Sequence, residues 1–150
     1  MRVSVYYNLH RHTWSLRAET GALRGRVIAH AEALRLDGVT CHVGPAGRAR
    51  VRRTGQKHVH AFVRGRLTAI SAPHLTARAR EAELVLPVSD ACLLPAGLAC
   101  QAVRFSYDPR IEDAFTTRGE DPPRPVARGR AAIFCAGGRA YMLSPACEMA

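Results

Sequence analysis

The densest group of residues able to bind a ligand or do chemistry lies at positions 44–66. It combines seven cations with two histidines and one phenylalanine, and it contains no acid. The members of this basic run are Arg48, Arg50, Arg52, Arg53, Lys57, His58, His60, Phe62, Arg64 and Arg66. Because like charges packed this closely repel one another, the run predicts an anion-binding surface, with nucleic acid as the first candidate.

Charge is also distributed unevenly over the whole chain. Residues 1–80 hold 15 cations and 3 acids, a balance of +12, whereas residues 81–150 hold 7 cations and 9 acids, a balance of −2. This asymmetry indicates a basic face that contacts the phosphate backbone of a nucleic acid. An acidic host protein presents similarly spaced negative charge, so an inhibitor that docks on such a protein is an alternative.

Histidines close to cations also suit acid/base chemistry on phosphate esters. Because histidine titrates near neutral pH, one ring can take up a proton while another releases one. His10, His58 and His60 are therefore candidate catalytic residues of an enzyme acting on RNA or a nucleotide. The chain lacks the phosphate-loop, dinucleotide-binding and common hydrolase signatures, so we expect binding rather than catalysis.

The five cysteines are widely spaced and form no C-x-x-C pair, which is typical of free thiols. A zinc site could only combine residues without a standard ligand spacing, namely Cys41, His42, His58 and His60. We therefore expect no metal and no cofactor.

Short strands are the elements expected to position these residues. Alternation of apolar and polar residues predicts strands at 3–9, 13–17 and 58–70, and similar short runs predict one at 103–107 and a hairpin at 131–143. In the strand at 58–70, parity puts Phe62 on the face of the cations and small apolar residues on the other face.

Three further segments carry turn or helix signals. Residues 26–36 fit either a strand with an irregularity or a short helix, and the strand is favoured because Asp37-Gly38 follows, a pair typical of hairpin turns. Short helices are predicted at 45–54 and 73–83. The fold class expected is α+β, mostly short antiparallel strands with one to three short helices, in a single domain over 1–150. No apolar run is long enough to cross a bilayer and no signal peptide is recognisable, so we expect a cytoplasmic protein.

Several sequence strings resemble a group of short, uncharacterised tailed-bacteriophage proteins. The strings are YNLH at positions 7–10, WS at 14–15, GRVIAH at 25–30 and VHAFV at 59–63. The resemblance implies a phage or prophage origin and a location in the cytoplasm of the bacterial host. It also suggests that residues 69–101 are an insertion relative to shorter members. It implies no particular reaction and no catalytic residue.

Overall fold

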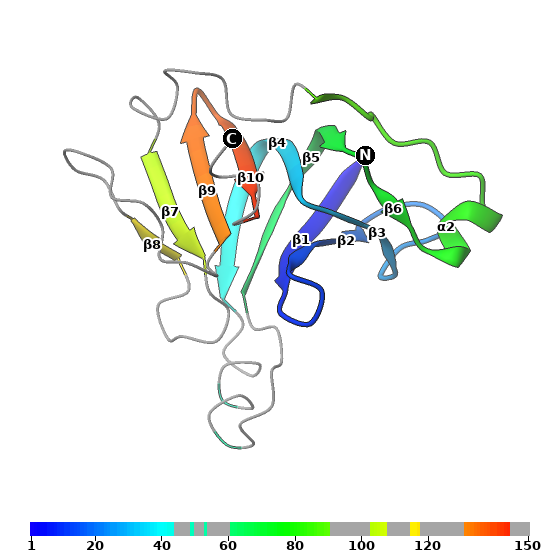
Figure 1. The fold of residues 1–150 in the computed structure, drawn as a ribbon, viewed down its shortest axis with the longest axis horizontal. Coiled ribbons are helices and arrows are strands. Elements are labelled where there is room, and N and C mark those ends of the chain that lie inside the picture. Colours follow the sequence, from blue (N-terminus) through cyan, green and yellow to red (C-terminus); the bar gives the residue numbers. More distant parts are fainter. Residues whose placement is uncertain are drawn as a thin grey trace.

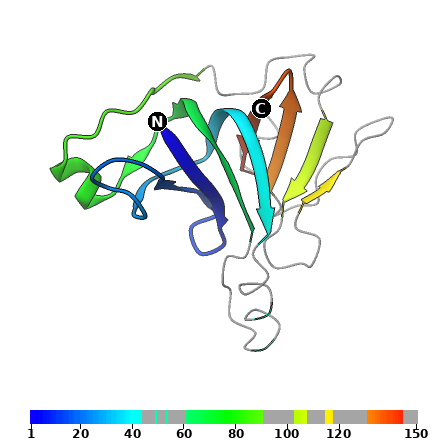
Figure 2. The same ribbon diagram turned by 180° about the vertical axis from the view of Figure 1, so that it is seen from behind.

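In the residues that the structure describes, ten strands form one antiparallel sheet in the order β6-β3-β2-β1-β5-β4-β10-β9-β7-β8 (Figure 1). The computed structural model describes residues 1–43, 61–90 and 131–144, the positions Ala49 and Arg53, and the backbone of 103–107 and 115–117. The strands are β1 (Arg2–Asn8), β2 (Thr13–Ala18), β3 (Val27–Ala31), β4 (Ala33–Val43), β5 (Ala61–Ser71), β6 (His74–Leu75), β7 (Val103–Tyr107), β8 (Phe115–Thr117), β9 (Ala131–Ala136) and β10 (Arg139–Leu143). The two longest strands, β4 and β5, stand side by side at the centre of the sheet (Figure 2).

The expected α+β class is wrong, because the structure is nearly all β. Within the described part of the chain, the one helix with defined bounds is α2 (Ala77–Glu81), of five residues. The helix predicted at 73–83 begins only at Ala77, because His74 and Leu75 form β6 and Thr76 caps the helix while bonding to the sheet edge. Its N–H and its hydroxyl both donate to the carbonyl of Ile28 on β3. The helix predicted at 45–54 lies outside the described residues except for Ala49 and Arg53, which are helical.

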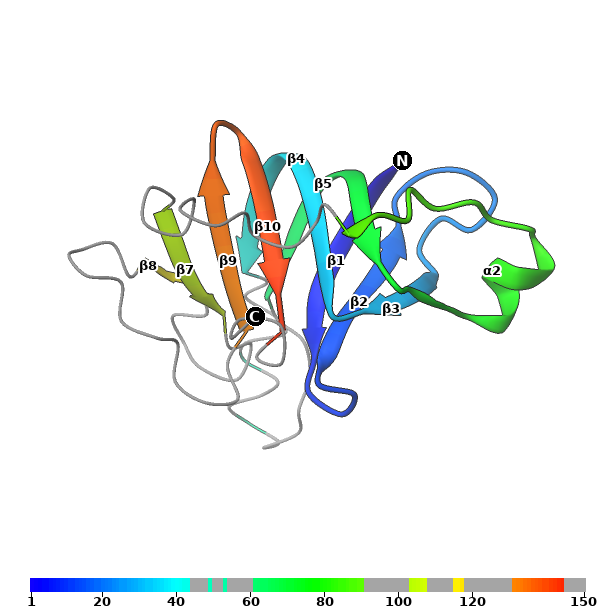
Figure 3. The ribbon, with the colours of Figure 1, turned by 45° about the horizontal axis from the view of Figure 1, so that its top comes forward.

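The sheet is rolled so strongly that β3 and β4, which stand four places apart in its strand order, meet at one corner. Only Glu32 separates β3 from β4, although β2, β1 and β5 lie between them in the sheet. In a flat sheet the two strands would stand four steps of about 4.8 Å apart, far beyond the reach of one residue. At the closing corner, Ala33 of β4 pairs with Ser71 of β5, and His30 of β3 pairs with His74 of β6. Figure 3 shows this curvature from above.

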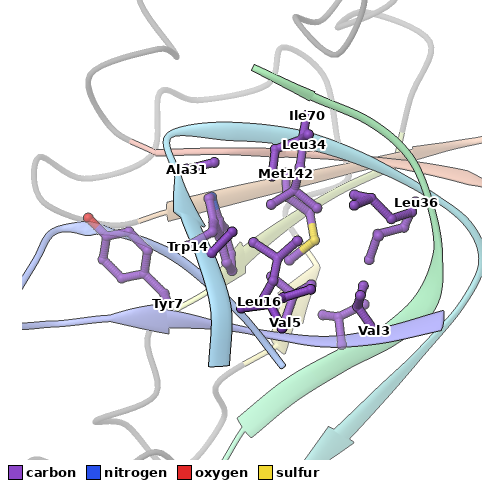
Figure 4. Close-up of a cluster of buried hydrophobic side chains, with 14 of the residues drawn as sticks. Val3, Val5, Tyr7, Trp14, Leu16, Ala31, Leu34, Leu36, Ile70 and Met142 are labelled. Carbon is purple, nitrogen blue, oxygen red and sulfur yellow. The ribbon is translucent and has the colours of Figure 1, made fainter. Parts of the chain in front are cut away.

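The inner face of the rolled sheet holds the hydrophobic core. Side chains of β1 and β2 meet those of β4, β5 and β10 there, and several are completely buried (Figure 4). The largest of these fully buried side chains are Trp14, Tyr7, Leu16, Ile28, Leu34, Leu36, Ile70, Ile133 and Met142. Burial of this apolar surface supplies the main driving force for the fold.

The predicted strands at 3–9, 13–17 and 103–107 and the hairpin at 131–143 are confirmed, with small changes of bounds. The strand predicted at 58–70 is confirmed from residue 61 onward, and residues 58–60 lie outside the described residues. Part of the stretch 69–101, suggested above as an insertion, packs into the fold, because Ile70, Ala79 and Leu86 are buried in the core. Residues 91–101 of that stretch lie outside the described residues.

The hairpin predicted at Asp37-Gly38 is wrong. β4 continues through this pair, and its pairing with β5 shifts register between Asp37 and Thr40. Gly38 has a φ of +60°, so the Asp-Gly pair forms a bulge that bends the strand instead of reversing it. The partner strand approaches closely here, since a Cβ added to Gly65 would lie 3.0 Å from the carbonyl oxygen of Asp37.

Candidate functional site

Strand β5 divides its side chains between the two faces as its sequence predicts. Ala61, Val63 and Leu67 are buried in the core, whereas Arg64 and Arg66 are exposed on the outer face. Phe62 shares this outer face and is partly exposed. Three of the predicted binding residues therefore lie together on one strand.

The strand registers arrange polar and aromatic side chains of neighbouring strands in three rows across the outer face. The ring row holds Tyr6, Phe62 and His42, the second row holds Arg17, Ser4, Arg64 and Thr40, and the third row holds Arg2, Arg66, Asp37 and Arg139. Successive rows are two residues apart along β1 and β5, which corresponds to about 7 Å, and on β4 the bulge adds one residue between Thr40 and Asp37. We call this surface, with its five exposed arginines and three rings, the arginine face.

The rings of the arginine face are in contact with its cations. The imidazole of His42 stacks on the ring of Phe62, with centroids 5.0 Å apart and planes inclined by 12°. The guanidinium of Arg64 lies 5.6 Å from the centroid of the same ring. The guanidinium of Arg17 lies 5.9 Å from the ring centroid of Tyr6, so the arrangement of a ring beside an arginine occurs twice.

Two carboxylates lie among these arginines although the basic run itself contains none. Glu19 is 3.3 Å from the guanidinium of Arg64 and also accepts a hydrogen bond from Ser4. Asp37 lies between two cations, 3.1 Å from Arg66 and 3.2 Å from Arg139. Five exposed arginines against these two carboxylates leave the arginine face with a charge of +3.

The hydrogen bonds that Tyr141 and Asp37 make with Arg139 raise the pKa of its guanidinium, so this cation stays charged at any physiological pH. The sequence pattern missed Arg139, Arg2, Arg17 and His42 as members of the site. The order of strands in the sheet, which brings the ring of His42 onto that of Phe62, is not visible in the sequence.

A second polar cluster lies toward β3 and is held by hydrogen bonds. The Asn8 amide donates to Ser15 Oγ at 3.2 Å, and Ser15 Oγ lies 2.8 Å from Nδ1 of His30. The three residues belong to the strings YNLH, WS and GRVIAH. Burial lowers the pKa of His30, and the charges of Arg11 and His74 lower it further. The hydrogen bonds of this cluster tie β1, β2 and β3 together.

The remaining predicted site residues are described only in part. Arg53 is exposed, and Arg48, Arg50, Arg52, Lys57, His58 and His60 lie outside the described residues. His10 occupies the exposed turn after β1, where its backbone N–H donates to Asn8 Oδ1 at 3.0 Å. The meeting of His10 with His58 and His60 that an acid/base mechanism needs stays a prediction.

The described residues also bear on metals, thiols and membranes. Within the ranges given above, no three His, Cys, Asp or Glu side chains gather around a common point that could hold a metal ion. Cys41 and Cys135 are free thiols, and burial raises the pKa of Cys135 to about 11. No helix in the described part of the chain has the length and apolar character required to span a bilayer.

Comparison with known proteins identifies a phage family. A family model described as the Mycobacterium phage L5 gene 82 protein matches residues 1–142. The match includes every row of the arginine face and the Asn8–Ser15–His30 cluster. Searches of curated proteins and of solved structures gave no match. Because the match covers nearly the whole chain, the resemblance to tailed-phage proteins is confirmed, and the chain belongs to the family of the Mycobacterium phage L5 gene 82 protein.

Proposed function

We propose that this phage protein binds nucleic acid through the arginine face and acts in the cytoplasm of the bacterial host. The observation that supports the proposal is that the ring row is followed, on one continuous surface, by two rows that carry arginines. Guanidinium groups bind phosphate by charge and by paired hydrogen bonds, while flat rings offer stacking surfaces for bases. Sheet surfaces of this composition suit binding with little base readout.

The place where the basic run joins the sheet also favours this proposal. Val43 and Ala61 are register partners at the ends of β4 and β5. The connection from 44 to 60, which carries Arg48, Arg50, Arg52, Arg53 and Lys57, therefore leaves and re-enters the sheet next to His42 and Phe62. We propose that its cations extend the arginine face and contact further phosphates.

The amount of charge that the ligand neutralises can be measured directly. Fluorescence anisotropy of a labelled oligonucleotide, recorded over a range of salt concentrations, should give a slope of log K against log salt of about −3 or steeper. Replacement of Arg64 or Arg66 by Gln should reduce the slope by roughly 0.7–0.9 each. Arg80→Gln, an exposed site on α2, is the matched control and should leave the slope unchanged.

Absence of binding to both DNA and RNA at low salt would refute the proposal. Pull-down from expressing cells, with and without nuclease, separates nucleic acid from an acidic host protein as the partner. A partner protein that stays bound after nuclease treatment, and is lost in the Arg64 and Arg66 variants, would favour the inhibitor hypothesis.

A further inference from the structure

The ring row crosses the sheet at right angles to the strands. Val5 of β1 pairs with Val63 of β5, so the next outer-face residues of the two strands, Tyr6 and Phe62, follow side by side. His42 of β4 is the register partner of Phe62 and stacks on it. Three rings from three adjacent strands thus form a line with steps of about 4.8 Å, the strand spacing.

The second row runs parallel to this line and places one guanidinium on each side of β1. Arg17 and Arg64 flank Ser4, because Ser4 is the register partner of both. The row lies about 7 Å from the rings, two residues along each strand. This separation is comparable to that between the base and the phosphate of one nucleotide, so rings and guanidiniums can contact the same strand of nucleic acid.

We propose that the ligand of the arginine face is single-stranded nucleic acid that lies across β1, β5 and β4, with bases on the ring row and phosphates on Arg17 and Arg64. The inference rests on the proposed function and specifies its ligand. In a duplex the bases are stacked on each other, and reading them requires an element that enters a groove. A row of rings on a sheet surface can contact only bases that are unpaired.

In the free protein two of the three rings lie beside an arginine, Tyr6 beside Arg17 and Phe62 beside Arg64, and this arrangement favours replacement of the guanidinium by a base. An exposed cation–π contact is weaker than the stacking of a base on an aromatic ring. A base that displaces Arg64 from Phe62 therefore gains more than the protein loses. The displaced guanidinium remains at the second row, where it can bind the phosphate of the same nucleotide.

The experiment compares labelled single-stranded DNA and RNA oligonucleotides with duplexes of the same sequence, by anisotropy at one low salt concentration. Tyr6→Leu and Phe62→Leu keep apolar bulk but remove the stacking surface. Each should weaken single-strand binding roughly 5- to 150-fold and leave duplex binding unchanged. Arg64→Gln should weaken binding to both. Thermal unfolding and circular dichroism of each variant show whether the fold is intact.

Photo-crosslinking locates the bound oligonucleotide on the wild-type protein, without any amino-acid substitution. Single strands carrying 5-bromodeoxyuridine should crosslink to the peptides that contain Tyr6 and Phe62. The inference would be overturned, while the proposed function stands, if the protein bound duplex and single strand equally well and the folded variants Tyr6→Leu and Phe62→Leu bound as tightly as wild type. Failure of the wild-type protein to bind any of the oligonucleotides would overturn both.

Discussion

Glu19 offers the sharpest test of whether the arginines of the outer face are available to a ligand. Its carboxylate lies 3.3 Å from Arg64, and the two side chains are 25% and 45% exposed. An ion pair that is this exposed to solvent contributes about 0.2–1 kcal/mol to the free energy of unfolding. In the folded protein this pair competes with phosphate for the guanidinium. Glu19→Gln keeps the size of the side chain but removes the competing charge.

We expect Glu19→Gln to bind a single-stranded oligonucleotide about 1.5- to 5-fold more tightly, which is the free energy of the ion pair expressed as a ratio of affinities. The gain should shrink as salt rises, because added ions screen exposed charges. Loss of up to about 1 kcal/mol of folding stability should lower the melting temperature by no more than about 2–4 °C. Anisotropy and thermal unfolding measure the two effects separately.

The control for net charge is Glu81→Gln. Glu81 is exposed on α2, which packs against β3, so this substitution makes the same change of charge outside the three rows. Its affinity should stay close to that of the wild-type protein. The reasoning fails if Glu19→Gln binds no more tightly than wild type, or if Glu81→Gln produces an equal gain.

Three further predictions concern stability. Gly65→Ala should destabilise the fold by about 1–3 kcal/mol in urea unfolding, since its new Cβ would lie 3.0 Å from the Asp37 carbonyl oxygen; a stability equal to wild type would contradict this. Leu16→Ala, at a fully buried position, should cost about 2–5 kcal/mol by the same measurement. The folded state lowers the pKa of His30, so the unfolded chain binds its proton more readily. The contribution of His30 to the free energy of unfolding should therefore be complete above pH 6.5 and should fall as the pH drops below that value. In urea unfolding at several pH values, the midpoint of His30→Gln should change less with pH than the midpoint of the wild-type protein.

Strand parity is the part of the structure that the sequence predicts well. Val3, Val5 and Tyr7 alternate with polar residues, and all three are buried. On β5 the same rule separates Val63 from Arg64 correctly. Alternation depends only on the two-residue period of a strand, so it can be recognised without knowing the neighbouring strands.

Features that depend on tertiary contacts could not be predicted in this way. The Asp37-Gly38 pair forms a bulge because β5 and β10 hold β4 on both sides, and a turn there would break both sets of hydrogen bonds. The carboxylates that neutralise part of the basic run are distant in sequence, since Glu19 is 45 residues from Arg64. Local charge counting therefore overestimates the charge of the assembled face.

The position of β10 beside β4 has a consequence for synthesis on the ribosome. The two strands are paired from Ala33 to Asp37, yet β10 begins 96 residues after β4 ends. At about 5–20 residues per second, one edge of β4 stays without this partner for roughly 5–20 s after the strand itself has been made. An unpaired strand edge can pair with another chain. The bulge at Gly38 bends this edge, a feature that limits pairing of nascent chains with one another until β10 arrives.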